Sequence, residues 1–600
     1  MPARFERQSA TAISGWVNRR ETPAVEIARA ALERVAAYEP VQPAVWIARV
    51  DPVEVLARAA AVDARIAAGE RLALAGVPFA VKDNLDVAGL PTTAACPAFS
   101  YRPDTTAPVV QRLLDAGAIL VGKTNLDQFA TGLTGSRSPY GALGSPYNRV
   151  FISGGSSSGS AVAVAAGLVA FALGSDTAGS GRAPAALNGL VGLKPTRGRW
   201  STRGLVPACR SLDCVSVLAN TTADARLVDE TAAGFDPEDP YARREPEVED
   251  SAPETFAFAL PPPAQLDWLG DSESPRLFHA VTERLRAMGG REVSVDIWVL
   301  LKAAELLYRG PWVAERTAAV EKILRQNPAA IHPVVRGILA GGLSISAVEA
   351  FRGEYALRVH QRAAEAIWAA ADVLVLPTTA TTYRVDEVLA EPLVLNANLG
   401  RYTNFVNLLD MSAIAVPAGF RENATGFGVT LIGPAWADRR LLSLAQRYEE
   451  IAPMPAFPPI ETDSVAAEVK LAVVGAHLAG MPLHWQLESR GARLVSRCKT
   501  AAVYRLYAVA ESVPPKPALA HVGAGGAAIE VEVYALRLEA FGSFVADVPP
   551  PLAIGTVTLE DGSAVKGFVA EPRALAGAED ITGFGGWRAF VSARSSPPRP

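Results

Sequence analysis

Apolar positions recur at helical spacing in two N-terminal stretches, residues 24–38 and 51–69. Before the first stretch, Thr22 and Pro23 have the form of an N-cap followed by a proline in the first turn. Between residues 74 and 218, strand-like and helix-like segments alternate. This alternation predicts an α/β core in which a central sheet is covered by helices.

Other parts of the chain have distinct patterns. Residues 161–174 are apolar and rich in small side chains, a stretch too short to span a membrane and typical of a fully buried core element. Residues 229–254 are acidic and contain prolines, which predicts a surface connection. Residues 274–370 have mostly helical patterns, and residues 371–379 return to a strand.

The composition shifts to proline near residues 451–459. We therefore predict a first domain over residues 1–450, a semi-rigid linker over 451–466, a second domain over 467–594 and a disordered tail over 595–600. In the second domain, strand patterns cover residues 471–475, 503–508 and 528–538, and a hairpin turn is expected at Asp561 and Gly562. These patterns predict a small α+β or barrel-like domain.

Composition excludes several classes of protein. The chain has 600 residues, 50% of them hydrophobic, and a net charge of −5 with no long basic run, so nucleic acid is not an expected partner. The N-terminal residues lack the apolar segment of a secretory signal. The four cysteines have no metal-binding spacing and are typical of reduced, buried thiols. We expect a cytoplasmic protein with no metal, no cofactor and no membrane partner.

Candidate chemistry is concentrated in two Gly/Ser-rich loops, residues 154–160 and 174–184. A serine nucleophile needs a base, but the first histidine of the chain is His279, which excludes a locally built Ser-His-Asp triad. The nearer candidate is Lys82, at the end of an apolar strand pattern; the chain has nine lysines, so 48 of its 57 basic residues are arginines. A buried lysine can lose its proton, whereas arginine does not. Lys123, which also follows an apolar strand, is a rival base.

Ordinary interpretations of these features exist. A lysine after a strand is usually solvated, and Gly/Ser loops are usually turns or phosphate cradles. No Gly-Lys-Ser/Thr motif follows either loop, so a P-loop is not supported.

Five segments together resemble the amidase signature family: residues 76–84, 122–127, 154–160, 174–184 and 189–198. The resemblance implies a mixed central sheet covered by helices and a catalytic triad of Lys82, Ser156 and Ser180. In that family the middle serine follows a cis peptide bond. Here Ser158 stands where glycine is common, so Ser157 is the alternative to Ser156 for that bond.

The same resemblance implies further site residues. The backbone N–H groups of the turn at the nucleophile would form the oxyanion hole, namely those of Thr177, Ala178, Gly179 and Ser180. Gly154 and Gly155 would line the substrate site. Asp176, just before the turn, is expected to order it by hydrogen bonds.

Three features narrow the range of substrates that we expect. Gly181 removes a branched side chain beside the nucleophile, residues 125–141 resemble the allophanate hydrolase form of that block, and residues 474–483 resemble the C-terminal domain of that group. This second domain would have a γ-glutamyl cyclotransferase-like fold. The group's carboxylate anchors fall on Tyr308 and Arg316, with Arg309 as the alternative cation. From spacing alone, these would be surface helix residues.

The resemblance implies hydrolysis of allophanate, a small molecule, to ammonia and N-carboxycarbamate, followed by decarboxylation to two NH₃ and two CO₂ overall. His477 is the acid/base candidate in the second domain, and His484 is a weaker one. The resemblance also implies a homodimer, with urea carboxylase or biuret-forming enzymes as pathway partners. The alternatives are a general small-amide amidase, an amidotransferase A-type subunit, and a catalytically silent scaffold.

Overall fold

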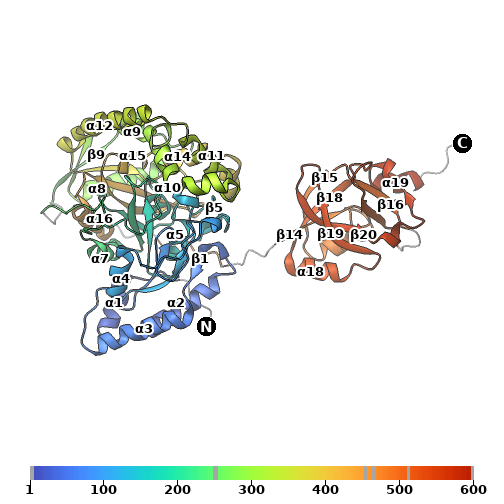
Figure 1. Ribbon diagram of the computed structural model, residues 1–600, viewed down its shortest axis with the longest axis horizontal. Coiled ribbons are helices and arrows are strands. Elements are labelled where there is room, and N and C mark those ends of the chain that lie inside the picture. The colour runs from blue at the N-terminus through green and yellow to red at the C-terminus, as the bar shows by residue number, and fades with distance from the viewer. Residues whose placement is uncertain (1–5, 248–253, 452–455, 463–467, 510–513, 596–600) are drawn as a thin grey trace. The chain divides into compact units, whose positions relative to one another are not determined.

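The chain forms two compact units, Met1–Asp463 and Ser464–Pro600 (Figure 1). The computed structural model describes residues 6–247, 254–451, 456–462, 468–509 and 514–595. Each unit has its own sheet and its own apolar core. The two units are therefore described separately.

An eleven-stranded mixed sheet forms the centre of the first unit. In spatial order its strands are β1 (Trp46–Arg49), β3 (Ile119–Thr124), β2 (Pro78–Lys82), β6 (Phe171–Asp176), β8 (Cys214–Ala219), β7 (Val191–Lys194), β12 (Ser412–Phe420), β13 (Gly426–Gly433), β11 (Val373–Pro377), β9 (Phe256–Leu260) and β10 (Gly290–Ser294). Strand β2 is parallel to both β3 and β6, whereas β6 is antiparallel to β8. This mixed sheet confirms the predicted α/β class.

Helices surround the strands of the first unit (Figure 1). Side chains alternate between the two faces of a strand, and β11 shows this directly: Val373 and Val375 join one apolar cluster, while Leu374 and Leu376 join another. The first cluster includes residues of α1 (Ala10–Asn18), α3 (Pro52–Ala67), α4 (Pro108–Asp115), α7 (Thr222–Ala232), α8 (Ser274–Ala287) and α16 (Asp438–Ile451). The second includes residues of α9 (Trp298–Arg309), α12 (Ala347–Ala370) and α15 (Phe405–Leu408). Because both faces are covered, most of the strands are buried from end to end.

Helix α2 (Ala24–Tyr38) begins one residue later than predicted, at Ala24 and not at Pro23. The N-cap position is Pro23, so the prediction of Thr22 as N-cap is wrong. The carboxylate of Asp63, on α3, accepts the free N–H groups of Ala24 (2.7 Å) and Val25 (3.1 Å) instead. A side chain distant in sequence thus satisfies the exposed donors of the first turn.

The apolar stretch 161–174 is completely buried, as predicted, but it is not one element. It is divided between α5 (Ser158–Ala165) and β6 (Phe171–Asp176). Gly167 lies between them with φ +69°, and a Cβ there would approach the carbonyl oxygen of Glu6 to 2.3 Å. Only glycine fits this turn, so the chain can reverse inside the core.

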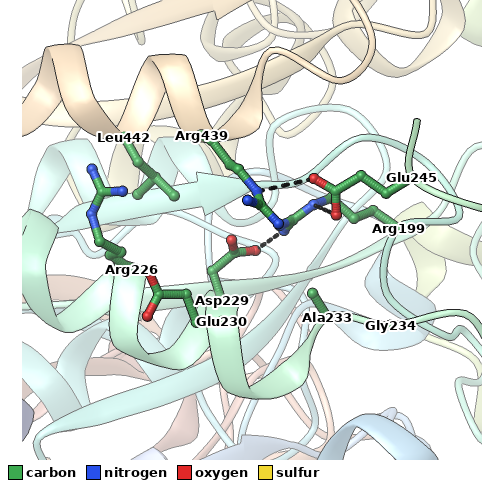
Figure 2. A pocket seen from close by; sticks show the side chains of 9 residues that line it. All are labelled: Arg199, Arg226, Asp229, Glu230, Ala233, Gly234, Glu245, Arg439 and Leu442. Carbon is green, nitrogen blue, oxygen red and sulfur yellow. Dashed lines mark hydrogen bonds and ion pairs between the residues drawn. The ribbon is translucent and has the colours of Figure 1, made fainter. Parts of the chain in front are cut away.

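The predicted surface connection 229–254 begins with a buried helical residue. Asp229 lies in α7, where its carboxylate accepts hydrogen bonds from Arg199 and from Trp200 Nε1. Beside it is a pocket of about 320 Å³ in which Arg199 and Arg439 both pair with Glu245 (Figure 2). Residues 248–253 lie outside the described residues.

Residues 274–370 are largely helical, as predicted, with β10 as an interruption. The helices are α8, α9, α10 (Trp312–Gln326), α11 (Pro333–Gly342) and α12. Within the described parts of the chain, no single helix is long and apolar enough to cross a membrane; the pair α11 and α12, bent by 96°, passes that test by length and composition alone.

The second unit contains two sheets. The larger has the strand order β15 (Arg493–Lys499), β18 (Glu530–Arg537), β14 (Glu468–Val473), β20 (Ala564–Ala570) and β19 (Leu552–Thr558). The smaller consists of β17 (Pro517–His521), β16 (Tyr504–Ala508) and β21 (Glu579–Asp580), and the helices are α17 (Trp485–Glu488), α18 (Leu538–Ala546) and α19 (Trp587–Ser595). The unit is therefore α+β. Its likeness to the γ-glutamyl cyclotransferase-like fold stays a prediction.

Part of the predicted linker packs against the first unit. The ring of Phe457 lies edge-on to Phe420, with 5.5 Å between centroids, and the Arg7 guanidinium lies 3.6 Å from the centroid of Phe457. Glu461 forms an ion pair with Arg149 at 3.1 Å. Of the predicted tail 595–600, Ser595 ends α19 and the rest lies outside the described residues. The predicted domain bounds stay predictions.

Candidate active site

Lys82 ends β2 in the interior of the first unit and is completely buried. Its Nζ lies 2.7 Å from Ser156 Oγ and 2.9 Å from Ser175 Oγ. Burial lowers the pKa of Lys82 to about 7, because an ammonium group loses its hydration there. Three buried carboxylates oppose this shift, those of Asp127, Asp176 and Asp213. At neutral pH a large fraction of Lys82 is therefore a free amine.

The loop that carries Ser156 has a constrained backbone. The peptide bond between Gly155 and Ser156 is cis, so the cis bond lies at Ser156 and not at Ser157. A Cβ on Gly155 would lie 2.1 Å from Asp127 Oδ2. The N–H of Asp127 donates to the carbonyl oxygen of Ser156 at 3.1 Å. Ser158, the departure from glycine, is accommodated as the first residue of α5.

The two Gly/Ser loops meet where the N–H of Ser157 donates to the carbonyl oxygen of Ser180, at 3.2 Å. Asp176 orders the second loop as predicted, because its carboxylate accepts the N–H groups of Gly179 (2.8 Å) and Gly181 (3.1 Å). Burial raises the pKa of Asp176, but the Arg182 guanidinium, 2.9 Å away, together with Lys194 and the N–H of Gly179, outweighs this effect and holds the pKa below its usual value.

Asp176 changes the expected oxyanion hole. The N–H of Gly179 is already bonded to its carboxylate, so it is not available to an oxyanion. Within the described residues, the N–H groups of Thr177, Ala178 and Ser180 have no hydrogen-bond acceptor. The Oγ of Ser180 likewise has no partner there, and it makes no hydrogen bond with Ser156.

Two site residues were missed by sequence reasoning. Ser175 bridges Lys82 and Asn84, whose Nδ2 lies 3.1 Å from its Oγ. Asp213 accepts hydrogen bonds from Thr177 Oγ1 and from the N–H of Cys209, and burial raises its pKa to about 6. Ser175 could have been suspected from its place beside Asp176 at the end of a strand. Asp213 has no local signal, because its partner is 36 residues away.

Tyr308 and Arg316 lie together, on α9 and α10. The guanidinium of Arg316 is 5.3 Å from the ring centroid of Tyr308, and its Nη1 donates to Thr131 Oγ1 at 3.3 Å. Arg316 is only 2% exposed, so it is not a surface helix residue. Its Nε is buried without a partner among the described residues. Arg316 therefore has unused donor capacity in the interior.

Arg137 is a further cation missed by sequence reasoning. It is 2% exposed and lines a pocket of about 370 Å³ together with Tyr308 and Arg309. Its Nη1 donates to the carbonyl oxygen of Thr131 at 3.0 Å, so Thr131 contacts both Arg137 and Arg316. Two buried guanidinium groups thus donate hydrogen bonds to one residue.

The rival candidates are placed differently. Lys123 is buried, but its Nζ is paired with Asp83 at 2.9 Å and also donates to the carbonyl oxygen of Pro91. The side chain of Arg309 is 82% exposed and lies 3.8 Å from Glu305. Lys123 therefore differs from Lys82 in having a carboxylate partner, and Arg309 differs from Arg316 in being exposed.

The two candidate histidines belong to the second unit. His477 Nε2 lies 2.8 Å from Gln486 Oε1, and its ring stacks on Phe568 with 5.0 Å between centroids. Burial lowers the pKa of His477 below its usual value. His484 Nε2 lies 3.0 Å from the hydroxyl of Tyr534. The catalytic role expected of His477 stays a prediction.

Comparisons with known proteins agree with this arrangement. Residues 26–442 match the amidase family model, and residues 469–592 match the model of the allophanate hydrolase C-terminal domain. The chain is 44% identical to the urea amidolyase of Saccharomyces cerevisiae over 548 residues, which is 87% of this chain. It spans only 30% of the length of that protein and of the urea amidolyase of Lachancea kluyveri.

Solved structures of amidases and of an allophanate hydrolase are also similar to this chain. The chain is similar to the allophanate hydrolase of Kluyveromyces lactis, with a TM-score of 0.72, 39% identity, and 99% of this chain and 100% of that one covered. It is also similar to the peptide amidase of Stenotrophomonas maltophilia, with a TM-score of 0.65, 27% identity, and 77% of this chain and 100% of that one covered. Because the family model matches well over half of its residues, the chain belongs to the amidase family and carries an allophanate hydrolase C-terminal domain.

Proposed function

We propose that this chain hydrolyses allophanate, which is urea carrying an N-carboxylate, at its terminal carboxamide. The observation that carries the chemistry is the buried Lys82, 2.7 Å from Ser156, next to the turn that holds Ser180. The substrate is supported by the similarity to the K. lactis allophanate hydrolase over 99% of this chain. The second unit supports it as well, since it matches the allophanate hydrolase C-terminal domain.

In the first step Ser180 Oγ attacks the carboxamide carbon. Ser156 accepts the proton of Ser180 and passes its own proton to the free amine of Lys82. A lysine with a pKa of about 7 suits this task, because it is a free amine often enough to accept the proton near neutral pH. Ser175 holds the amine in place from the other side.

The tetrahedral intermediate carries negative charge on the former carbonyl oxygen. The unpaired N–H groups of Thr177, Ala178 and Ser180 are the donors we assign to it, whereas the N–H of Gly179 serves Asp176. As the C–N bond breaks, the leaving nitrogen takes a proton from Ser156 and departs as ammonia. Water then attacks the acyl-enzyme and releases N-carboxycarbamate.

The carboxylate of allophanate needs a cation, and we assign Arg316 to it with Tyr308 beside it. A guanidinium can bond a carboxylate through two parallel hydrogen bonds. Arg316 fits this role because it is buried and its Nε has no partner among the described residues. Gly154 and Gly155 would line the same site.

The second unit is proposed to decarboxylate N-carboxycarbamate, with His477 as the acid/base candidate, so that two NH₃ and two CO₂ form overall. Allophanate itself would be supplied by an enzyme that carboxylates urea, or by one acting on biuret. The four cysteines are all unpaired thiols, which supports a reducing compartment such as the cytoplasm. Fractionation of the source cells would test that location.

A homodimer is also proposed, and α12 offers a surface for it. Val348, Phe351, Tyr355 and Val359 lie on one face of this helix, and each is between 59% and 67% exposed. Such a stripe of large apolar side chains is typical of an interface.

The substrate assignment predicts that the purified chain releases ammonia from allophanate much faster than from acetamide, malonamide or biuret. Ser180→Ala should lower this activity by at least about a thousandfold, because the nucleophile is lost. Ammonia production measured on all four compounds checks the prediction. Equal rates on acetamide and allophanate would contradict the substrate, and an active Ser180→Ala variant would contradict the nucleophile.

The anchor assignment predicts that Arg316→Gln raises the KM for allophanate about ten- to one-hundredfold, because a charge-assisted hydrogen bond to the carboxylate is lost. Acetamide has no carboxylate, so its kinetics should change far less. Arg309→Gln is the matched control, since that arginine is exposed. An unchanged KM in Arg316→Gln, or an equal effect in Arg309→Gln, would refute the assignment.

The role of Lys82 predicts a pH dependence. Below its pKa of about 7 the amine is protonated and cannot accept a proton, so kcat should rise between pH 6 and pH 8 with a midpoint near pH 7. Lys82→Met should abolish the activity. Steady-state rates across this range, with circular dichroism at each pH as the folding control, provide the measurement. A midpoint near 10, typical of a solvated lysine, would show that Lys82 is not the base.

The α12 surface predicts that light scattering gives a mass about twice the 63.1 kDa of one chain. Phe351→Asp should shift this mass to that of a single chain, because a charge would be buried in the interface. Val53→Asp is the control, as Val53 is an exposed apolar residue on α3. A monomeric wild-type chain, or a Phe351→Asp variant that remains dimeric, would count against this interface.

A further inference from the structure

The second unit contains a cavity of about 430 Å³ beside β18. Its wall includes Arg497 and Lys499 from β15, Glu532 from β18, and Arg588 from α19. His477 is not among the described residues that line it. Leu478, the neighbour of His477 in the chain, does line it. The cavity is therefore a candidate binding site next to the main acid/base candidate of this unit.

Glu532 is the buried charge of this cavity, with a side chain 2% exposed. One carboxylate oxygen accepts from Arg497 Nε (2.9 Å) and Arg588 Nη2 (3.1 Å). The other accepts from the N–H of Ala479 (2.7 Å) and the hydroxyl of Tyr534 (3.0 Å). Burial raises the pKa of Glu532, but these donors outweigh it and the pKa stays below its usual value. Glu532 is thus a fixed anion whose lone pairs are already used.

Glu532 uses only part of the hydrogen-bonding capacity of Arg497 and Arg588. Glu532 engages only Nε of Arg497 and Nη2 of Arg588; the second of these also donates to the carbonyl oxygen of Ala479. Among the described residues, no acceptor is bonded to the terminal nitrogens of Arg497, to Nε and Nη1 of Arg588, or to Nζ of Lys499. One buried carboxylate therefore holds two guanidinium groups in place and leaves donors of both unused.

The pocket of Figure 2 provides a contrast. Three arginines and three carboxylates line it, and there Arg199 is bonded to both Asp229 and Glu245, while Arg439 is bonded to Glu245 as well (Figure 2). In the cavity of the second unit, two arginines share one carboxylate. Its other two carboxylates, Glu530 and Glu560, belong to exposed residues. An incoming anion can therefore pair with donors that the protein does not use.

We propose that this cavity binds a small dicarboxylate, the N-carboxycarbamate released by the first unit, through Arg497 and Arg588, with Glu532 as the residue that positions both. This inference rests on the proposed function. Guanidinium groups bond carboxylates bidentately, which suits a ligand with a carboxylate at each end.

The site also suits the loss of CO₂. In that step one C–N bond breaks, its electron pair stays on nitrogen, and the nitrogen takes a proton from a water molecule, which leaves as hydroxide. One carboxylate leaves as CO₂, and the other remains as carbamate. An arginine that binds the retained carboxylate holds the molecule while the other end departs. Arg497 and Arg588 are positioning and binding residues in this scheme, and Glu532 acts only through them.

Binding can be tested with malonate, which has CH₂ in place of the N–H. Calorimetry would use the full chain carrying Arg316→Gln, so that the proposed carboxylate anchor of the first unit is absent. We expect malonate to bind this chain, and binding to weaken at least about tenfold when Arg497→Gln and Arg588→Gln are added. Arg505→Gln, on β16 of the same unit, is the matched control and should leave binding unchanged. Absence of binding to the Arg316→Gln chain, or equal affinity in the triple variant, would overturn the proposal.

Turnover separates this inference from the proposed function. With ¹³C-labelled allophanate and otherwise native protein, Arg497→Gln/Arg588→Gln should release the first ammonia at the normal rate and accumulate N-carboxycarbamate in the ¹³C NMR spectrum. CO₂ and the second ammonia should follow about tenfold more slowly than in the native chain. If the native chain releases no ammonia, the proposed function fails; if ammonia appears and CO₂ release is unchanged in the variant, only this inference fails.

A folding control completes the experiment. The side chain of Arg497 is 65% exposed, so its replacement should leave the thermal midpoint of the second unit nearly unchanged. Glu532→Gln is a second test, because it weakens the anchor of both arginines and should slow CO₂ release without changing the first ammonia release. A Glu532→Gln variant that is folded and has normal CO₂ release would show that this carboxylate is not needed to position the two arginines for that step.

Discussion

The burial of Lys82 without a directly bonded carboxylate is the constraint on which the first unit depends. An ammonium group in the protein interior is costly unless it is paired, and Lys82 is bonded to two serine hydroxyls instead. The result is a pKa of about 7, because the protein stabilises the free amine relative to the ammonium form. Lys123 shows the alternative: it is also buried, but Asp83 neutralises it directly. Of these two lysines, Lys82 is the one without a carboxylate partner.

The sheet and its covering helices make this burial possible. Strand β2 lies inside the sheet between β3 and β6, so its terminal residue is surrounded by protein. The segment α5–β6 then places both Gly/Ser loops against that strand end. Glycine is required where the loops approach other atoms closely, as at Gly155 beside Asp127. The same tight packing commits the N–H of Gly179 to Asp176.

Glu532 in the second unit shows the opposite outcome for a buried charge. It keeps its charge because four donors surround it, whereas Lys82 tends to lose its own charge. Each solution serves a different purpose. A group with a shifted pKa can transfer protons, and a group with a stable charge can fix the orientation of its partners.

The sequence alone determined the order of the motifs, among them the segments of Lys82 and the two Gly/Ser loops, and it predicted the α/β class and the second unit that the structure has. These follow from local patterns: apolar strands, glycine-rich turns and a proline-rich boundary. Tertiary structure decided the rest. It replaced Thr22 by Asp63 as the partner of the first turn of α2, divided residues 161–174 into a helix and a strand, and brought Asp213 to Thr177. It also buried Arg316, which spacing alone would place on the surface. Each of these depends on contacts between segments far apart in the chain or on the space available in the core, and no local pattern records them.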